Sequence, residues 1–514
     1  MNVGIAVARS AKRWPGHVAV FDGDRTSTFA QLDERTNRLA NALHARGIGL
    51  GDRVALLIPN RLEVLEVLGG CAKAGAVYCG LNFRLGEEEY EAIFENAEPR
   101  LLITEPQFAE LAGRLSERFG VPVVALDDEG PDGYEALLAA APGTLPPQVH
   151  DVRPEHHFCI VYTSGTTGRP KGVLFDHQSV LHHALVATLE YELDEQSRWL
   201  MALPHNSSVQ ITLLPLLLVG GATGFNDSRG FDAVAFAAEV RRTQATHTYL
   251  VPTMLFRVLE AGITREDIAT LTTIGYGAAP IPPERVLELL QRFGPIFTQL
   301  YGMAEVASIG TMLRKDDHAR ALAGETRLLA SAGRAGLAMD VRVVDDARRD
   351  VAAGERGEVV FGSPHTMLEY FRDPVRTGDA LIDGWMHSGD IGQIDEQGYI
   401  YIVDRKKDLI IRGGFNIVPS EIENVLYQHP AVLEASVVGI PDQEWGEAVI
   451  GFVALKQGEA ADGDSLRAWC ADQGLPSIKV PQAVRVLDSL PKNLVGKIAK
   501  RELRDSLWQG ERKV

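Results

Sequence analysis

One stretch of the chain decides both its fold class and its chemistry: YTSGTTGRPKG, residues 162–172. Apolar residues precede it at 158–161 and follow it at 173–175, and each run is typical of a short buried strand. Glycines at 165, 168 and 172 let the backbone bend and approach a ligand closely, because no Cβ stands in the way. Hydroxyl groups and the Lys171 ammonium add donors and positive charge. The stretch therefore predicts a cradle for an anion, and a polyphosphate is the anion that fits best.

Two other interpretations of this loop conflict with the sequence around it. A Walker A loop needs G-x-x-x-x-G-K followed by Ser or Thr and then a helix, whereas here Gly172 and a strand-like run follow Lys171. A flexible Gly/Ser linker is not expected between two buried strands. A phosphate-binding loop between two strands is the prediction that remains.

Size and composition predict a globular protein of more than one domain. The 514 residues exceed what one hydrophobic core usually fills, so we expect at least two domains. A formal net charge of −18 argues against nucleic acid or an anionic membrane as the main partner. The four cysteines have no C-x-x-C spacing and no accompanying His cluster, so we expect buried, reduced thiols: Cys71, Cys79, Cys159 and Cys470.

No segment has the pattern of a secretion signal or a membrane span. Residues 1–16 contain only a short apolar run, which Arg9, Lys12 and Arg13 interrupt. The most apolar later stretch, residues 211–219, is too short to cross a bilayer. We therefore expect a cytoplasmic protein without a transmembrane segment.

The order of strand and helix patterns along the chain predicts α/β layers, followed by a small β-rich subdomain and a small C-terminal domain. Strand and helix patterns alternate over the first ~150 residues and again after residue 172, as in an open α/β sheet. From about residue 331 short strands and glycine turns predict a small β-rich subdomain. A charged pivot, DRKKD, occupies residues 404–408, and a capping box of Ser420 with Glu423 is expected to open the next helix. The last ~110 residues are expected to form a small α+β domain.

Further motifs follow the phosphate loop in order. They are GYGAAP at 275–280, TQLYGMAE at 298–305, MHSGD at 386–390, the DRKKD pivot, IRGGFNI at 411–417 and LPKNLVGKI at 490–498. A carboxylate beside a triphosphate is the natural Mg²⁺ ligand, so Glu305 is the metal-binding candidate. A guanidinium such as that of Arg405 suits ribose or phosphate oxygens better than an ammonium does.

This series resembles the acyl-adenylate-forming superfamily of acyl-CoA synthetases, peptide-synthetase adenylation domains and luciferases, over nearly the whole chain. The resemblance implies a large N-terminal domain of doubly wound α/β layers, residues 1–404, with the β-rich subdomain at 331–404. A hinge at 405–408 and a small mobile α+β domain at 409–514 would follow, with Lys407 as the hinge residue.

The resemblance also implies a role for each matching residue. The ATP phosphates would lie against Thr163, Ser164, Gly165, Thr166, Thr167, Gly168 and Lys171. Adenine and the rest of the nucleotide would contact Gly277, Ala278, Ala279, Gln299, Tyr301, Gly302 and Ala304. Asp390 and Arg405 would bind ribose and phosphate, and Glu305 would bind the metal. Lys497 would be the catalytic lysine that contacts the acyl carboxylate and the α-phosphate.

The remaining implied residues bind coenzyme A and the acid. Gly413 and Gly414 would line the pantetheine tunnel, and Trp445 and Lys479 are candidates for stacking on adenine and pairing with phosphate. The family usually has an aromatic or His gate three residues after a proline, but His205 follows Pro204 at once. The gate is therefore His205 or Ser207, and His205 as an ordinary core or surface histidine stays equally open. Ala304 and Asn493 also depart from the family, which has hydroxyl residues at these positions.

The implied reaction is that of an AMP-forming acyl-CoA synthetase with ATP, Mg²⁺ and coenzyme A. The apolar stretch at 211–219 and the small residues at 277–279 suggest a medium-chain or aromatic monocarboxylic acid. A stand-alone adenylation enzyme that loads a carrier-protein phosphopantetheine is one alternative. A nucleotide-binding pseudoenzyme is another, favoured only by Ala304 and the irregular gate. A dimer is one oligomeric state that the sequence leaves open.

Overall fold

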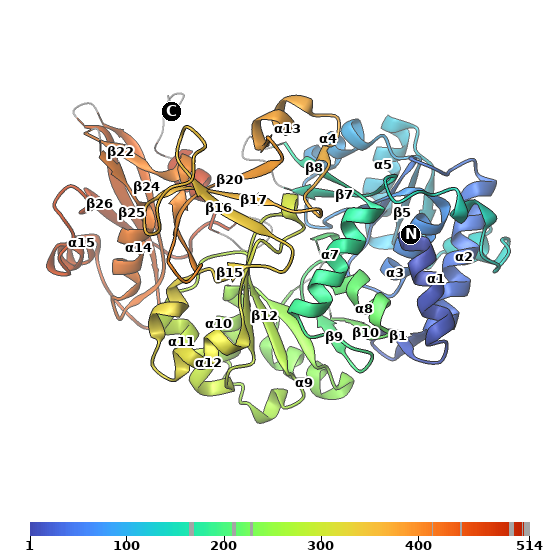
Figure 1. Cartoon of the computed structure of the whole chain (residues 1–514), viewed down its shortest axis with the longest axis horizontal. Coiled ribbons are helices and arrows are strands. Elements are labelled where there is room, and N and C mark those ends of the chain that lie inside the picture. The colour runs from blue at the N-terminus through green and yellow to red at the C-terminus, as the bar shows by residue number, and fades with distance from the viewer. Residues whose placement is uncertain are drawn as a thin grey trace.

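A computed structural model gives the architecture, and the residues that it describes are 1–163, 169–207, 212–226, 230–413, 415–442, 445–492, 498–505 and 507. Two large mixed sheets and their helices make up the N-terminal part, and two five-stranded sheets follow them along the chain. The C-terminal sheet lies at one end of the elongated molecule and helices α1–α3 lie at the other (Figure 1).

The first large sheet has seven strands in the order β18-β8-β7-β4-β3-β5-β6. Strands β7, β4, β3, β5 and β6 run parallel, whereas β8 and β18 are antiparallel additions at one edge. The strand bounds are β3 (Arg53–Leu57), β4 (Val77–Gly80), β5 (Leu101–Thr104), β6 (Val123–Ala125), β7 (His157–Thr163), β8 (Lys171–Asp176) and β18 (Glu369–Tyr370).

The second large sheet has nine strands in the order β15-β14-β13-β12-β11-β9-β10-β1-β2. Its central strands β13, β12, β11, β9, β10 and β1 are parallel. The bounds are β1 (Val18–Asp22), β2 (Arg25–Thr28), β9 (Arg198–Met201), β10 (Ala222–Phe225), β11 (His247–Leu250), β12 (Thr273–Gly277), β13 (Phe297–Tyr301), β14 (Thr311–Leu313) and β15 (Arg334–Ala335).

Helices cover both faces of each large sheet, which confirms the doubly wound arrangement. Alternate residues of β3 face opposite cores: Val54 and Leu56 join the core between the two sheets, whereas Ala55 and Leu57 pack with α4 and α5. A third core lies between the nine-stranded sheet and α9–α11. The helices are α1 (Val3–Arg13), α2 (Phe29–Ala45), α3 (Glu63–Ala74), α4 (Glu87–Ala97), α5 (Ala109–Phe119), α6 (Tyr134–Ala139), α7 (His177–Glu190), α8 (Leu214–Val219), α9 (Ala233–Thr243), α10 (Pro252–Glu260), α11 (Pro283–Phe293) and α12 (Lys315–Leu322).

The β-rich unit and the C-terminal domain follow as predicted. One five-stranded sheet contains β16 (Asp340–Val344), β17 (Gly357–Gly362), β19 (Leu381–Ile382), β20 (Trp385–Ile394) and β21 (Ile400–Arg405), with α13 (Pro374–Ala380) beside it. The C-terminal sheet contains β22 (Ile410–Arg412), β23 (Phe415–Ile417), β24 (Val432–Asp442), β25 (Gly446–Leu455) and β26 (Ala483–Leu487), with helices α14 (Pro419–Tyr427), α15 (Gly463–Asp472) and α16 (Lys500–Asp505). A larger N-terminal domain and a smaller C-terminal one are thus present, while the boundary residues proposed above stay a prediction.

The predicted capping box at the start of α14 is wrong. The helix begins after Val418, with Pro419 in its first turn and no side-chain cap. The Ser420 hydroxyl instead donates to the Val403 carbonyl, and the Glu423 carboxylate accepts from the backbone N–H of Val437 at 2.7 Å. Contacts with β21 and β24 thus replace the local cap that the spacing suggested.

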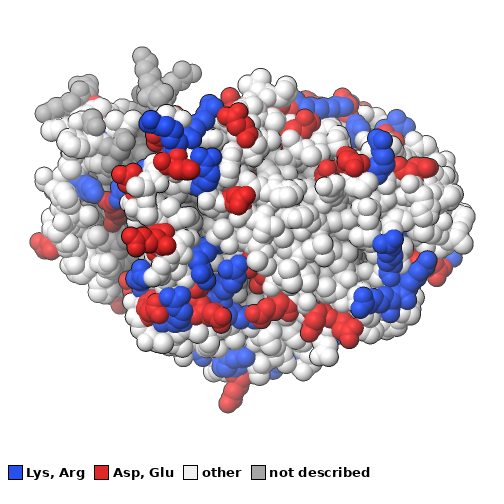
Figure 2. All heavy atoms as spheres, in the orientation of Figure 1, with Lys and Arg blue, Asp and Glu red and all other residues white. Residues whose placement is uncertain are grey.

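Two other predictions concern the chain as a whole. All four cysteines are buried free thiols, as expected: Cys71, Cys79, Cys159 and Cys470. Among the residues described, no helix is both long and apolar enough to cross a bilayer. Acidic and basic side chains are interspersed over the face in Figure 2, and a central area of that face carries neither.

Candidate active site

The phosphate loop connects two strands, β7 and β8, as the sequence predicted, and these strands pair antiparallel. Strand β7 ends at Thr163 and β8 begins at Lys171, and these two residues pair directly across the ladder. The inner residues of both strands are buried, which fixes the two ends of the loop. The loop residues Ser164, Gly165, Thr166, Thr167 and Gly168 themselves lie outside the described residues.

Tyr370 connects the lysine of this loop to the predicted magnesium ligand. The short strand β18 returns from far along the chain to pair with β8, with Tyr370 opposite Val173. Its ring lies under the Lys171 ammonium, with Nζ 4.8 Å from the ring centroid. Its hydroxyl donates to Oε1 of Glu305 at 2.5 Å. One side chain thus contacts both the lysine predicted to bind the ATP phosphates and the carboxylate predicted to bind the metal.

Burial keeps this tyrosine a hydrogen-bond donor. Burial raises the pKa of Tyr370 well above its usual range, and the neighbouring Glu305 carboxylate raises it further. The phenol therefore stays protonated and can donate to Glu305 throughout the physiological pH range. Glu305 is itself 7% exposed, and the Met367 N–H donates to its backbone oxygen at 2.7 Å.

The backbone after Glu305 is strained in a way that the sequence did not reveal. Glu305 lies in a single 3-10 turn, Ala304–Val306. The next two residues, Ala307 and Ser308, both have left-handed backbones, with φ of +51° and +80°. Each such residue costs roughly 1 kcal/mol or more, and such strain concentrates at functional sites. The backbone oxygen of Ser308 also lies 2.2 Å from where a Cβ on Gly302 would stand, so only glycine fits there.

Asp390 and Arg405 meet on neighbouring strands of the β-rich sheet. They pair in register between β20 and β21, and Nε of Arg405 lies 2.8 Å from Oδ1 of Asp390. The Tyr301 hydroxyl donates to the other carboxylate oxygen at 2.8 Å. The carboxylate is largely buried, whereas Arg405 is half exposed. Three residues predicted to contact the nucleotide thus lie together, although here they bind one another.

The remaining nucleotide candidates line the ends of β12 and β13. Gly277 pairs with Leu300, whose backbone oxygen would lie 2.1 Å from a Cβ at residue 277. Ala278 has a left-handed backbone, with φ of +68°, and is exposed, while Ala279 is partly buried beside it. The Gln299 side chain accepts a hydrogen bond from the Tyr276 hydroxyl at 3.2 Å. Backbone packing therefore explains the glycine, and nucleotide contact by these residues stays a prediction.

The coenzyme A candidates cluster on the C-terminal domain around Arg412, which the sequence did not single out. The Gly413 N–H donates to the Trp445 carbonyl at 2.7 Å, and a Cβ on Gly413 would lie 2.8 Å from the indole. The Arg412 guanidinium lies 5.8 Å from the centroid of the same ring and donates to the Ile478 carbonyl at 2.9 Å. Lys479, the next residue in the chain after Ile478, forms an ion pair with Glu421. Trp445 is 44% exposed, so it is not the core residue that its type suggests.

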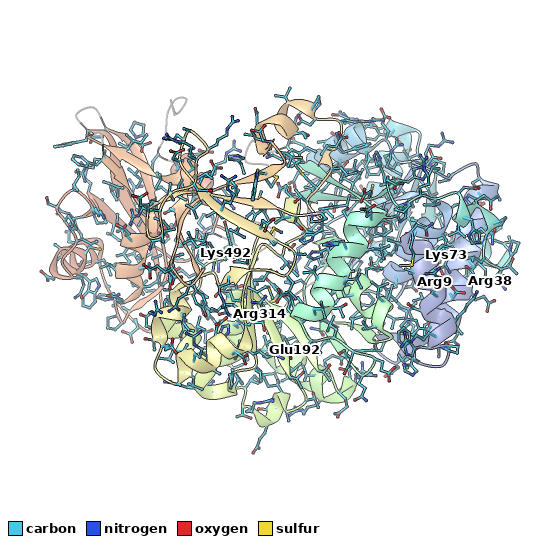
Figure 3. The ribbon with its side chains drawn as sticks, in the orientation of Figure 1. Arg9, Arg38, Lys73, Glu192, Arg314 and Lys492 are labelled. Atoms are coloured by element: carbon cyan, nitrogen blue, oxygen red, sulfur yellow. The ribbon has the colours of Figure 1, made fainter. Side chains whose placement is uncertain are left out.

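Several predicted residues lie outside what the structure describes. Gly414 and Lys497 are not described, and neither are the side chains of Lys407 and Ser207. An isolated antiparallel bridge joins Lys492 to Ile498, so the two ends of the segment that carries Lys497 lie side by side. Lys492, labelled in Figure 3, is fixed by an ion pair with Glu434 at 2.6 Å.

His205 is a buried and fully bonded side chain. Its Nδ1 lies 3.0 Å from the Tyr78 hydroxyl and its Nε2 lies 3.1 Å from the Ile58 carbonyl oxygen. Burial lowers the pKa of His205 to about 4, so the ring is neutral. A swinging gate would have to break both hydrogen bonds, which favours a fixed wall. Contact with the acid stays a prediction.

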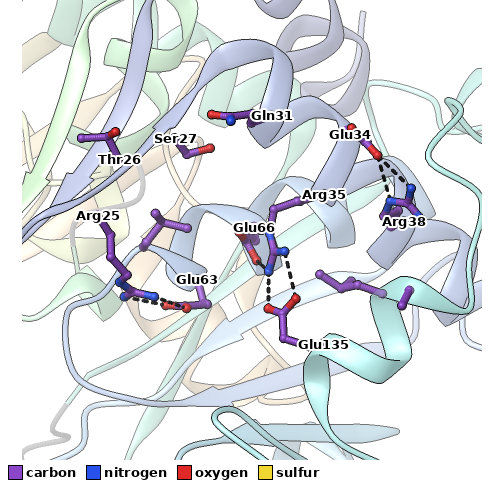
Figure 4. A pocket seen from close by; sticks show the side chains of 13 residues that line it. Arg25, Thr26, Ser27, Gln31, Glu34, Arg35, Arg38, Glu63, Glu66 and Glu135 are labelled. Carbon is purple, nitrogen blue, oxygen red and sulfur yellow. Dashed lines mark hydrogen bonds and ion pairs between the residues drawn. The ribbon is translucent and has the colours of Figure 1, made fainter. Parts of the chain in front are cut away.

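A charged pocket on α2, α3 and α6 is separate from these residues (Figure 4). Its arginines are already paired: Arg25 with Glu63 at 2.7 Å and Arg35 with Glu135 at 2.6 Å. Burial would raise the pKa of Glu63, but hydrogen bonds from Arg61 and Arg25 lower it to about 2. These ion pairs join β2 to α3 and α2 to α6, and they leave little charge for a ligand.

Comparison with known proteins agrees with this architecture. The family model for the AMP-binding enzyme matches residues 7–371, and the model for the AMP-binding enzyme C-terminal domain matches residues 421–497. A feruloyl-CoA synthase from Amycolatopsis sp is 38% identical, covering 98% of both chains. A fatty acid–[acyl-carrier-protein] ligase, ScoC from Streptomyces coeruleorubidus, is 36% identical, covering 97% of this chain and 95% of its own.

The fold is also similar to that of a protein whose crystal structure is known. The crystal structure of ATP-bound MatB from Rhodopseudomonas palustris superposes with a TM-score of 0.89 at 28% identity, covering 98% of this chain and 99% of that one. Both family models fall on the two domains seen in the structure, in the same order. The chain therefore belongs to the AMP-binding enzymes of the acyl-adenylate-forming superfamily, in the branch of AMP-forming acyl-CoA ligases.

Proposed function

We propose that this protein is an ATP-dependent acyl-CoA synthetase for a medium-chain or aromatic monocarboxylic acid. The observation that carries the proposal is the Lys171–Tyr370–Glu305 cluster beside the phosphate loop, in a chain of this family. The names of two relatives support this choice: one is a feruloyl-CoA synthase, whose acid is aromatic, and the other is a ligase for a fatty acid.

The first half-reaction would join the acid to AMP. A carboxylate oxygen attacks the α-phosphorus of ATP, the bond from that phosphorus to the bridging oxygen breaks, and pyrophosphate leaves. Lys171 and the loop residues would hold the departing pyrophosphate, and Asp390 with Arg405 would orient the ribose. Lys497 would stabilise the charge that builds on the α-phosphate.

Glu305 is suited to hold a magnesium ion. It is an almost buried carboxylate with one oxygen bonded to the Tyr370 hydroxyl, so its orientation is fixed. Carboxylates together with substrate phosphates are the usual Mg²⁺ ligands. When bound, the ion would neutralise phosphate charge during the displacement.

The second half-reaction would transfer the acyl group to a thiol. The sulfur attacks the acyl carbon, the bond to the AMP oxygen breaks, and the thiol proton is released to solvent. Rotation of the C-terminal domain about Lys407 would bring the Gly413–Trp445 cluster to the site. Lys479 would have to exchange its partner Glu421 for a phosphate of coenzyme A.

The ScoC relative supports a second candidate, in which the thiol belongs to a carrier-protein phosphopantetheine. An acid panel containing ferulate, benzoate, octanoate and malonate separates the possibilities when pyrophosphate and AMP release are measured with coenzyme A, with carrier protein, or with neither. We expect thioester with coenzyme A for an aromatic or medium-chain acid. Thioester with carrier protein alone would favour the second candidate, and ATP binding without pyrophosphate release for any acid would favour a pseudoenzyme.

A further inference from the structure

The Gln299 side chain, one of the nucleotide candidates, is the outer end of a buried chain of hydrogen bonds. It lies 3.2 Å from the Tyr276 hydroxyl oxygen, which in turn lies 2.8 Å from Nε2 of His318. Nδ1 of the same imidazole lies 2.8 Å from the backbone oxygen of Arg314. Tyr276 and His318 are fully buried, whereas Gln299 is partly exposed. The chain of hydrogen bonds therefore runs from the protein core to a side chain that is open to a ligand.

Three elements of the fold hold this chain of hydrogen bonds in place. Tyr276 and Gln299 pair directly between β12 and β13, so their side chains lie on the same face of the sheet. His318 belongs to α12, which packs against β13. The start of α12 is fixed as well, because the Arg314 guanidinium donates two hydrogen bonds, of 2.9 and 2.7 Å, to the buried Glu190 carboxylate on α7.

Counting the protons gives the chain of hydrogen bonds a direction. A backbone carbonyl can only accept, so Nδ1 of His318 carries a proton that it donates to Arg314. Burial lowers the pKa of His318 to about 4, so the ring is neutral and Nε2 has only a lone pair. Burial also raises the pKa of Tyr276 well above its usual range, so the phenol keeps its single proton. That proton has to point at Nε2, because two lone pairs would otherwise face each other in the core.

This direction decides which end of the Gln299 amide faces Tyr276. With Oε1 toward the phenol, as described above, one proton would face two acceptors, Oε1 and Nε2 of His318, and one of the two would stay unpaired. Half a turn of the amide exchanges its oxygen and nitrogen without changing its shape, and the NH2 group then donates to the phenol oxygen. Within the described part of the chain this contact is the one hydrogen bond of the Gln299 amide. Its oxygen is then left to accept from a ligand.

We propose that Tyr276 and His318 are positioning residues that turn the Gln299 amide oxygen toward the nucleotide base and thereby select a 6-aminopurine. The amino group of adenine donates to an amide oxygen. Guanine and hypoxanthine carry an oxygen at the same position, which would meet the amide oxygen lone pair against lone pair. The opposite direction of the hydrogen bonds would present the NH2 group and favour a 6-oxopurine. The inference rests on the proposed function in one respect, which is that Gln299 contacts the base.

Comparing ATP with inosine triphosphate (ITP) tests the proposal, because the two nucleotides differ only at C6 of the base and the adjacent N1. Binding is measured by calorimetry on the full chain without acid, and kcat/KM by pyrophosphate release with acid. We expect the wild type to bind ATP at least about 10-fold more tightly than ITP. Tyr276→Phe removes the group that orients the amide, so it should lower the ATP/ITP ratio about 3- to 10-fold. The change should lie in KM for ATP more than in kcat.

Variants of His318 test the direction of the hydrogen bonds separately. His318→Phe keeps a ring in the core but removes the acceptor of the Tyr276 proton, which then has Gln299 as its acceptor. The amide NH2 would turn outward, so the ATP/ITP ratio should fall below that of Tyr276→Phe. His318→Gln offers the phenol an amide oxygen as acceptor and should restore much of the preference for ATP.

Tyr399→Phe is the matched control, because it removes a buried hydroxyl that donates to Asp317, the neighbour of His318 on α12. It should leave the ATP/ITP ratio unchanged. Equal losses of ATP and ITP binding in Tyr276→Phe would reveal a merely structural role and overturn the proposal, and so would an unchanged ratio in Gln299→Leu. Calorimetry needs no acid, so selective ATP binding without pyrophosphate release for any acid would refute the proposed function and still support the positioning role.

Discussion

Replacing Tyr370 with Phe removes one hydroxyl from the centre of the proposed adenylation site. The ring under Lys171 stays, but Glu305 loses the donor at 2.5 Å that fixes its carboxylate. Losing a hydrogen bond that orients a metal ligand typically costs about 10- to 100-fold in metal affinity or activity. This range equals about 1.4–2.8 kcal/mol, which agrees with the value of a hydrogen bond to a charged group.

The assay is pyrophosphate release at fixed ATP and acid while Mg²⁺ is varied. For Tyr370→Phe we expect the half-activating Mg²⁺ concentration to rise about 10- to 100-fold, with much of the activity recovered at saturating Mg²⁺. Tyr370→Leu also removes the ring beneath the Lys171 ammonium, an interaction of about 0.5–2 kcal/mol. Its KM for ATP should therefore rise as well, which separates the role of the ring from that of the hydroxyl.

Tyr399 provides the matched control. Its hydroxyl also donates to a buried carboxylate at 2.5 Å, that of Asp317 on α12, which belongs to neither cluster of the candidate site. Tyr399→Phe should lower the free energy of unfolding by about 1–3 kcal/mol, much as Tyr370→Phe does, but leave the Mg²⁺ dependence unchanged. If the two variants lose stability equally and neither changes the Mg²⁺ curve, the positioning role of Tyr370 is refuted.

Three further predictions address the half-reactions and the acid response. Lys497→Ala should reduce acyl-AMP formation at least about 100-fold but spare thioester formation from supplied acyl-AMP, and equal losses in both assays would contradict its role. Gly414→Leu should do the reverse, slowing thioester formation while pyrophosphate release without coenzyme A continues; unchanged thioester formation would count against a tunnel there. The pKa of His205 in the folded protein, about 4, lies below the unfolded value of about 6.5, so the unfolded chain takes up the proton first. Stability should fall as the pH drops from about 6.5 to 4, by up to about 3 kcal/mol for this residue. Urea unfolding of His205→Gln at pH 7 and pH 4.5 should show a smaller difference than the wild type, and an identical difference would refute the assignment.

The candidate site contains two clusters of interacting residues, which we expect a nucleotide to join. Lys171, Tyr370 and Glu305 bind one another near the loop, while Asp390, Arg405 and Tyr301 bind one another on the β-rich sheet. In both clusters a charged group has a partner that a nucleotide would replace or share. This arrangement keeps buried charges satisfied between catalytic cycles.

Local patterns were enough to predict the elements and the order of the motifs. The predictions of β7, β8 and the glycine turns depend on residues close in sequence, and so does the prediction of reduced thiols from the spacing of the four cysteines. The structure confirms the two strands and the buried thiols. The capping box of Ser420 failed because β21 and β24 offered the two side chains better partners. Propensity and capping rules describe a segment alone, and tertiary contacts can override them.

The sequence by itself determined the family, the two-domain α/β layout and the identity of most candidate residues, because the phosphate loop and the later motifs are short contiguous patterns. Only the tertiary structure decided which of those residues touch. Tyr370 is 199 positions from Lys171 and reaches it because β18 crosses back to pair with β8. Arg412 becomes part of the Trp445 cluster through pairing between β22 and β25. Strand pairing across such separations depends on the whole chain folding, which no local pattern encodes.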